Sequence, residues 1–488
     1  MRRRDEPLRP QFHFSPHRNW INDPNGLVHV DGEYHLFFQY NPQGDQWGHM
    51  NWGHAVSTDL LHWQELPVAI PEDERVSIFS GSVVIDEHNS SGFGDGRTPP
   101  LVAIYTGCLR RPEGGQAQEL AWSTDRGRTW TKYAGNPVLD RGLRDFRDPK
   151  VFWHAGTARW IMLVSVPDER RLAFYESVDL KAWTLLSHFD AGLAGQGIWE
   201  CPDLFELPVD GEAPVWVLKV DVFEGHPSQG SGARLFLGQF DGRQFTLMPQ
   251  DRPLWADHGA DFYAALSWAN LGRRAVWIGW MNCHRYAKLL PTQPWRGAMS
   301  VPRDLSLKRR PAGLSLCQWP VPELTAWHGA TAQHAVLEVA STSTLLPPAM
   351  DGRALDIEFT VAHSDAQAFG LRLRASDDEF TRIGYDRDRG VVFVDRTRSG
   401  FSPAGDPHYA GRREAACPGP APGRPLHLRV LVDHCSVELF VGEGEIVITE
   451  QILPRDDSRG LLAWSDGGRT RFEGVRVAEI QRPSSTRP

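Results

Sequence analysis

The sequence predicts an all-β protein in which an N-terminal β-propeller is followed by a C-terminal β-sandwich. A motif that reads S-x-D, a short gap and then W occurs at residues 57–63, 123–130 and 177–183, and residues 240–245 form a degenerate fourth copy. Around these copies, short strand-like runs are separated by Gly, Pro, Asn and Asp, without long helical periodicity. Between residues 426 and 449, apolar and polar residues alternate with the period of β-strands.

Each copy of the motif combines a turn with an aromatic side chain. The Asp side chain can cap its own turn, and the Trp can pack between neighbouring sheets. The copies recur at intervals close to the ~40–50 residues of common propeller blades plus loop insertions. This regularity favours a propeller over a chance coincidence of turns.

Two turns are predicted near the N-terminus. Asp31-Gly32 separates two strand-like runs, which is a hairpin signal. In the stretch WINDPNG, residues 20–26, the last four residues have turn chemistry, because Pro fixes φ and Asn-Gly tolerates positive φ. A Trp and an Asn stand shortly before Asp23 in this stretch, as if to hold its carboxylate in one place.

The composition of the sequence changes near Pro311. Residues 330–348 are rich in Ala, Ser and Thr and resemble a connector. We therefore predict a catalytic propeller over residues 1–322, a linker over 323–345 and a β-sandwich over 346–482. The alternating runs in the last segment predict antiparallel strands with one solvated face.

The composition is that of a globular protein with an excess of acidic residues. The chain has 488 residues, of which 41% are hydrophobic and 23% charged, and its formal net charge is −9. This charge argues against a nucleic-acid partner or an anionic membrane surface. Acidic residues and a proline follow the basic residues 2–4, and no later segment is apolar enough to span a bilayer. We expect a cytoplasmic protein, or a secreted or periplasmic one if a leader has been removed.

Cysteine usage and missing motifs exclude several chemistries. The six cysteines lie far apart without a CxxC pair, and we expect them to be buried free thiols. The sequence contains no H-E-x-x-H, no G-x-S-x-G and no G-x-x-x-x-G-K-[ST] motif. It therefore predicts neither a metal ion nor a cofactor. The 19 tryptophans favour a carbohydrate ligand, because indole faces stack on the C–H faces of sugar rings.

Three acidic residues share an unusual local context. Asp23 and Asp148 each precede a proline, and Glu200 lies in the segment W-E-C-P-D. Such positions favour extended backbone at strand ends, and a propeller can bring residues from different blades to one central funnel. Taken singly, each could equally be a turn-capping Asp or a surface Glu.

The neighbours of these carboxyl groups predict different pKa values. Apolar residues flank Glu200 and should raise its pKa, whereas Arg147 beside Asp148 should keep that carboxyl ionised. Two carboxyl groups in opposite protonation states are what the cleavage of a glycosidic bond requires.

Three blocks in order, WINDPNG, FRDPK and WECPD, resemble the signature blocks of glycoside hydrolase family 32, the invertases, levanases and inulinases. The resemblance also covers DFYA at residues 261–264, PWRGAMS at 294–300 and SVELF at 436–440. It implies a propeller of about five blades followed by a β-sandwich. One departure is Ile21, which stands where Met is more usual in the family.

The resemblance also implies the roles of individual residues. Asp23 would be the nucleophile, Glu200 the general acid/base and Asp148 a stabiliser of the transition state that binds fructosyl hydroxyls. The turn predicted in WINDPNG would then present the attacking carboxylate. The implied substrate-binding residues are Asn22, Gln39, Trp47, Phe79, Ser80, Arg147, Tyr263 and Trp295.

The implied activity is that of a retaining exo-β-fructofuranosidase acting on sucrose, fructo-oligosaccharides, inulin and levan, without metal or cofactor. A fructosyltransferase or an endo-levanase on the same scaffold remains an alternative, as does a catalytically inactive fructan-binding lectin. The sandwich could bind sugar, although packing against the propeller is the simpler role. The preferred linkage, β-2,1 or β-2,6, and the oligomeric state stay open.

Overall fold

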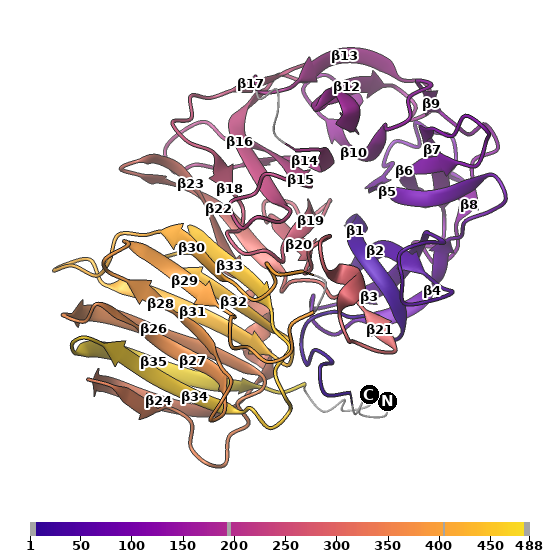
Figure 1. Cartoon of the computed structure of the whole chain (residues 1–488). Helices are drawn as coiled ribbons and strands as arrows, with labels where there is room; N and C mark the ends of the chain where they lie inside the picture. The colour runs from indigo at the N-terminus through magenta and orange to yellow at the C-terminus, as the bar shows by residue number, and fades with distance from the viewer. Residues whose placement is uncertain (1–5, 193–196, 404–405, 483–488) are drawn as a thin grey trace.

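The computed structural model describes residues 6–192, 197–403 and 406–482. A ring of short sheets forms the N-terminal part, and long strands stacked in two layers form the C-terminal part (Figure 1). The helices described are short 3-10 segments: η1 (Pro167–Glu169), η2 (Ala287–Leu289) and η3 (Pro322–Trp327). Within the described residues, no helix has the length and the apolar character needed to cross a membrane.

Five sheets make up the described N-terminal part, and all of their strand pairs but one are antiparallel. The first two contain β1 (Asn19–Val30), β2 (Glu33–Asn41), β3 (Asn51–Ser57) and β4 (Gln64–Ile70), then β5 (Val76–Ile85), β6 (Leu101–Leu109), β7 (Gln116–Ser123), β8 (Thr131–Lys132) and β9 (Leu139–Asp140). The third contains β10 (Arg147–His154), β11 (Arg159–Val166), β12 (Arg171–Ser177) and β13 (Thr184–Phe189). The last two contain β14 (Trp199–Leu207), β15 (Val215–Val222), β16 (Gly232–Phe240), β17 (Phe245–Leu247) and β18 (Leu254–Trp255), then β19 (Tyr263–Ser267), β20 (Val276–Trp280), β22 (Arg303–Arg310) and β23 (Gly313–Pro320). The exception is β21 (Trp295–Arg296), which pairs in parallel with β1 and so joins residues distant in sequence.

The repeated motif is the turn that connects the third and fourth strands of a sheet. Asp59 and Asp179 each accept backbone N–H groups in their turns, as predicted. The aromatic residue of the motif packs against the neighbouring sheet: Trp63 stacks on Trp268 at 6.3 Å, and Trp130 meets Phe37 edge-on at 5.5 Å. The same contact recurs in successive sheets, and this repetition is the packing of a β-propeller.

The prediction of a turn at residues 20–26 is wrong. The whole segment lies within β1, and the true turn is Asp31-Gly32, which joins β1 to β2 as a hairpin as predicted. Pairing between β1 and β2 shifts register twice, around Asp23 and after Asn25. The turn chemistry of D-P-N-G is therefore used to bulge a strand rather than to reverse it.

Two six-stranded antiparallel sheets form the C-terminal sandwich. The first contains β24 (His328–Val339), β35 (Thr470–Ile480), β26 (Leu355–Ser364), β31 (Leu426–Asp433), β32 (Ser436–Val441) and β33 (Ile446–Gln451), and the second contains β25 (Thr342–Thr344), β34 (Gly460–Asp466), β27 (Ala368–Ala375), β28 (Thr381–Asp386), β29 (Val391–Asp395) and β30 (Arg412–Ala416). Residues 323–345, expected to be a linker, instead hold η3, β24 and β25. The strand β24 pairs along most of its length with β35, so this segment is part of the sandwich.

The predicted solvated face of the sandwich is also corrected. All six residues of β32 are buried. Leu439 faces the core between the two sheets, whereas Phe440 belongs to a cluster that includes Phe12 and Val301 from the N-terminal part. The alternating pattern is real, but at β32 the second face packs against the propeller rather than facing water, whereas β24 keeps many exposed residues.

Buried charges also join the two parts. His13 lies between two carboxylates of the sandwich, with its Nδ1 2.7 Å from Asp433 Oδ2 and its Nε2 2.7 Å from Glu438 Oε1. Nearby, Arg303 pairs with Glu438 and with Asp257. Burial alone would lower the pKa of His13, but the hydrogen bonds to Asp433 and Glu438 outweigh burial and raise the pKa to about 9.

We expect the stabilisation from His13 to be lost in alkaline solution. Because the pKa of His13 rises from 6.5 unfolded to about 9 folded, its contribution is complete below about pH 6.5 and disappears as the pH rises through about 9. The contribution is on the order of 3 kcal/mol. Thermal unfolding of the wild type and of His13→Gln should therefore give a Tm difference that narrows between pH 6.5 and 9.5. The exposed His17→Gln is the matched control, and a Tm difference for His13→Gln that stays constant with pH would contradict this account.

Candidate active site

The first strands of the five N-terminal sheets surround the centre of the ring (Figure 1). Each contacts the next, from β1 to β5, β10, β14 and β19 and back to β1. Each also carries a register shift near its start, which we call the inner bulges. These bulges lie between Ile21 and Pro24, Ile78 and Gly81, Arg147 and Lys150, Glu200 and Asp203, and Tyr263 and Leu266.

The sequence explains why the strands bulge here. Pro24, Pro149 and Pro202 have no N–H group, so a regular hydrogen-bond ladder cannot continue through them. Asp148 and Cys201 adopt positive φ values of 65° and 45°, which is uncommon for residues other than glycine. A bulge bends the strand and redirects a side chain. The inner bulges thus direct Asp23, Asp148 and Glu200 to one place.

The carboxylate of Asp23 is held by its neighbours in WINDPNG and by the next sheet. Asn22 Nδ2 donates to Asp23 Oδ1 at 3.0 Å, and Trp20 Nε1 in turn donates to Asn22 Oδ1 at 2.7 Å. The hydroxyl of Ser80, on β5, donates to Asp23 Oδ2 at 2.6 Å. The Trp and Asn before Asp23 therefore form a relay that fixes the orientation of its carboxylate.

Cys201 connects Asp23 to Asp148. Its backbone N–H donates to Asp148 Oδ2 at 2.9 Å. Its Sγ lies 3.6 Å from the same oxygen and 3.5 Å from Asp23 Oδ2. Side chains from β1, β10 and β14 thus meet at a single thiol, and the sequence had offered no sign of this role for Cys201.

Arg147 favours the ionised form of Asp148, as expected, but burial has the larger effect on this carboxyl group. Burial raises the pKa of Asp148 to about 7; the charge of Arg147 opposes this shift, and the charges of Glu200 and Asp23 add to it. Arg147 adjoins Asp148 in sequence, but its guanidinium turns to other carboxylates. The Asp148 side chain is only 7% exposed, so water does little to stabilise its charge.

Glu200 receives one hydrogen bond from each of two side chains. Arg147 Nε donates to Glu200 Oε1 at 2.9 Å, and the hydroxyl of Tyr263 donates to Oε2 at 2.5 Å. Arg147 is itself held by Asp145 and by the amide oxygen of Gln116. The acidic residue predicted as the proton donor is therefore oriented from both sides.

The remaining predicted substrate-binding residues occupy different environments. Trp47 is 48% exposed, and its ring lies edge-on to that of Phe79 at 6.1 Å. Gln39 is buried in β2. Trp295 packs with Met281, Ala298 and Cys435, beneath the guanidinium of Arg9. Within the described chain, neither Gln39 nor Trp295 hydrogen-bonds to the three carboxylates.

Two charged residues beside the site were missed by the sequence analysis. Asp221 lies opposite Glu200 in the pairing of β14 with β15, and it forms a fully buried ion pair with Lys219. Lys219 Nζ also donates to the carbonyl of Cys201 at 2.6 Å. Burial raises the pKa of Asp221 to about 7, and the charges of Asp23 and Glu200 act in the same direction. The signal was present in the strand VWVLKVDV, where two charges stand on one face of an otherwise apolar run.

His284 is a further neighbour that the sequence did not indicate. Its ring meets Tyr263 edge-on at 4.7 Å and lies 5.1 Å from Trp280. Burial lowers its pKa, although the charges of Glu200 and Asp23 oppose that shift. Its Nε2 has no hydrogen-bond partner among the described residues.

The described residues contain no group of three or more His, Cys, Asp or Glu side chains that could hold a metal ion. The six cysteines are free, and all but Cys108 are buried.

Carboxyl groups gathered at the centre of a propeller that carries a β-sandwich are an arrangement suited to a glycoside hydrolase. A family model described as glycosyl hydrolases family 32 N-terminal domain matches residues 13–320, and one described as glycosyl hydrolases family 32 C terminal matches residues 323–479. The chain belongs to glycosyl hydrolase family 32.

Relatives of known name cover nearly the whole chain. A levanase of Bacillus subtilis (strain 168) is 46% identical over 99% of this chain and 72% of its own length. The extracellular exo-inulinase inuE of Aspergillus niger is 41% identical over 99% of this chain and 96% of its own. Among solved structures, an exo-inulinase from Aspergillus awamori has a TM-score of 0.90 and 39% identity, covering 98% of this chain and 99% of that one. A β-fructofuranosidase from Schwanniomyces occidentalis, complexed with fructosyl-erythritol, has a TM-score of 0.90 and 30% identity, covering 97% and 98%.

Proposed function

We propose that this chain is a retaining exo-β-fructofuranosidase that hydrolyses terminal, non-reducing β-D-fructofuranosyl residues of sucrose, fructo-oligosaccharides, inulin and levan. The observation that carries the proposal is the meeting of Asp23, Asp148 and Glu200, from three different sheets, around Cys201 and Arg147. The names of the relatives, levanase and exo-inulinase, support the substrate class.

The proposed reaction has two displacements at C2 of fructose. The Asp23 carboxylate attacks C2 while the bond between C2 and the leaving oxygen breaks, and Glu200 gives its proton to that oxygen. A water molecule then attacks C2, Glu200 takes up its proton, and the ester bond to Asp23 breaks. Each displacement inverts C2, so the released fructose keeps the β configuration.

The geometry supports these roles. Ser80 and Asn22 fix Asp23 through short hydrogen bonds, which preorganises an attacking carboxylate. Arg147 and Tyr263 orient Glu200. Asp148, which is buried beside Asp23 and Cys201, would bind fructosyl hydroxyls and stabilise the positive charge that develops on the sugar.

The residues proposed to bind substrate around one terminal fructose unit are Asn22, Gln39, Trp47, Phe79, Ser80, Arg147, Tyr263 and Trp295. The exposed ring of Trp47 and its neighbour Phe79 would form an apolar wall for the sugar. Each of the five sheets would be one blade of the propeller, which we propose to end near residue 322. The word extracellular in the names of several relatives supports the secreted alternative for this enzyme.

Product analysis tests the proposal. We expect free fructose as the earliest product from inulin and levan, because the proposed site takes one terminal fructose unit, and we expect NMR to show β-fructofuranose before mutarotation. In a substrate-bound crystal structure, the carboxyl groups of Asp23 and Glu200 should lie roughly 5–5.5 Å apart. Early mixed fructo-oligosaccharides would indicate an endo-levanase, longer chains made from sucrose a fructosyltransferase, and binding without sugar release a lectin. Any of these three results would overturn the proposal.

A further inference from the structure

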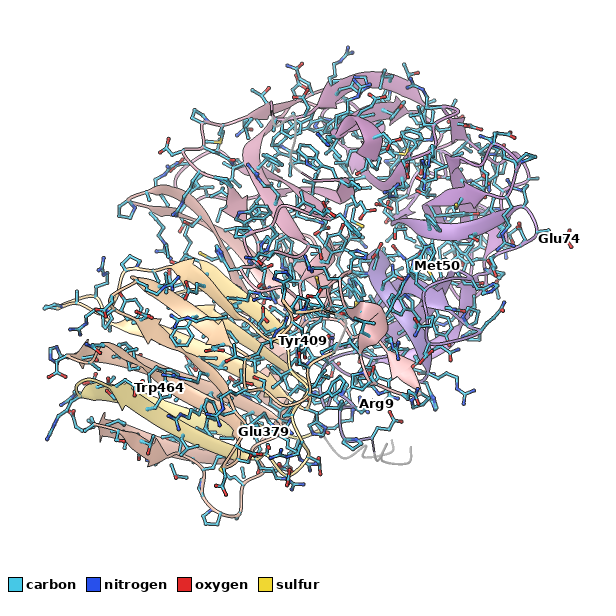
Figure 2. All side chains as sticks on the ribbon, in the orientation of Figure 1. Arg9, Met50, Glu74, Glu379, Tyr409 and Trp464 are labelled. Carbon is cyan, nitrogen blue, oxygen red and sulfur yellow. The ribbon has the colours of Figure 1, made fainter. Side chains whose placement is uncertain are left out.

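Tyr409 lies where the sandwich meets the propeller (Figure 2). The guanidinium of Arg396, a sandwich residue, lies over the ring of Tyr409 at 4.1 Å from its centroid. Arg396 is 1% exposed. It reaches across the junction to two propeller residues: its Nη1 donates to Asp261 Oδ2 at 2.7 Å, and its Nη2 donates to the hydroxyl of Tyr286 at 2.9 Å. The Tyr286 hydroxyl in turn donates to Asp261 Oδ1 at 2.6 Å. We call Arg396, Asp261 and Tyr286 the junction triad.

Other sandwich residues reinforce the junction triad. Arg396 Nε lies 2.8 Å from Glu450 Oε2, and Glu450 Oε1 accepts the backbone N–H of Ala260 at 2.7 Å. The backbone N–H of Gln451 donates to Asp261 Oδ2 at 2.8 Å. The side-chain amide of Gln451 donates to the carbonyl of Met281 at 2.6 Å. These hydrogen bonds attach the sandwich to two propeller segments, the one before β19 and the one after β20.

One of these segments carries Tyr263, which contacts Glu200, and the other carries His284, which packs against Tyr263. Tyr263, which donates to Glu200, follows Asp261 by two residues. His284 precedes Tyr286 by two residues, and its ring meets Tyr263 edge-on at an interplanar angle of 89°. The junction triad therefore fixes the backbone two residues before Tyr263 and two residues after His284.

We propose that Arg396 is a positioning residue of the active site, through which the sandwich fixes Tyr263 against Glu200 and His284 against Tyr263. The inference rests on the proposed function, because it takes Glu200 as the group that protonates the leaving oxygen. Loss of the guanidinium would leave the buried carboxylate of Asp261 without the cation it pairs with, and Glu450 with only the more distant Arg413 Nε at 3.7 Å. The two propeller segments would have to move to solvate these carboxylates. Small displacements are sufficient to impair proton transfer, because its rate depends on the distance and alignment of donor and acceptor.

The test compares Arg396→Met with Arg374→Met on two substrates. Arg374 is also buried in the sandwich, but it donates only to backbone carbonyls of the sandwich. A misplaced proton donor slows the hydrolysis of sucrose, which has a poor leaving group, more than that of an activated aryl β-fructofuranoside. We expect kcat of Arg396→Met to fall about tenfold more on sucrose than on the aryl fructoside. Arg374→Met should lose thermal stability without changing the ratio of the two kcat values.

Two further variants keep the test decisive. Tyr286→Phe removes one link of the junction triad but keeps the buried charges, so it should fold and shift the kcat ratio in the same direction. In a Tyr263→Phe background, Arg396→Met should add little to that shift, because the residue through which it acts has already lost its hydroxyl. Equal losses on both substrates, the same ratio change in Arg374→Met, or full additivity with Tyr263→Phe would overturn the inference while leaving the proposed function intact. A wild-type protein inactive on both substrates would overturn the proposed function and this inference with it.

Discussion

Replacing Asp23 by asparagine is expected to lower kcat on sucrose by several orders of magnitude. The amide keeps the size of the side chain and can still accept a hydrogen bond from Ser80, but it cannot attack C2 as a carboxylate does. Loss of covalent catalysis should raise the barrier by about 5 kcal/mol or more. Steady-state kinetics on sucrose, with circular dichroism to follow the fold, provide the measurement.

Ser80→Ala is the matched control for this prediction. It removes the hydrogen bond to Asp23 Oδ2 but leaves the attacking charge, so kcat should fall by roughly tenfold, the cost of one lost hydrogen bond to a charged group. If Asp23→Asn stayed within tenfold of the wild type, Asp23 would not be the nucleophile.

Glu200→Ala is expected to nearly abolish the hydrolysis of sucrose and to slow the hydrolysis of an activated aryl β-fructofuranoside much less. A good leaving group departs without a proton, so general-acid catalysis contributes less to its release. Azide should partly restore turnover, because it attacks C2 of the fructosyl ester on Asp23 without needing a base and forms fructosyl azide. Chromatography of the products and kcat on both substrates provide the measurement.

Asp148→Ala provides the contrast. A residue that stabilises charge on the fructosyl unit should impair both substrates alike, and azide should restore nothing. If Glu200→Ala and Asp148→Ala showed the same dependence on the leaving group, the roles proposed for these two carboxyl groups would be wrong.

The features predicted correctly from the sequence are mainly local. The Asp-Gly hairpin and the capped S-x-D turns depend on residues a few positions apart, and the structure confirms them. The alternating strands of the sandwich are confirmed for the same reason. The choice of a propeller from the spacing of the turns also holds, because the turns at Trp63 and Trp130 place their aromatic residues against the neighbouring sheet.

The wrong predictions concern residues whose partners are distant in sequence. Arg147 does lower the pKa of the adjacent Asp148, but burial and the charges of Asp23 and Glu200, which lie on other sheets, raise it. Residues 323–345 have the composition of a linker, but pairing with the C-terminal strand β35 makes most of them part of a sheet. Sequence neighbours cannot indicate such partners.

The sequence by itself determined the β-rich fold and the two kinds of β architecture, and it singled out three carboxyl groups that the structure brings together. Turn chemistry, strand period and motif order can all be recognised in short segments. Only the tertiary structure decided which groups surround each carboxylate. The closed ring of first strands brings Cys201, Asp221 and Tyr263 to the site, and burial in that ring raises the pKa of Asp148 against the expected effect of Arg147. The physical reason is that desolvation and hydrogen bonding depend on position in space, and the inner bulges set that position through contacts between strands far apart in the chain.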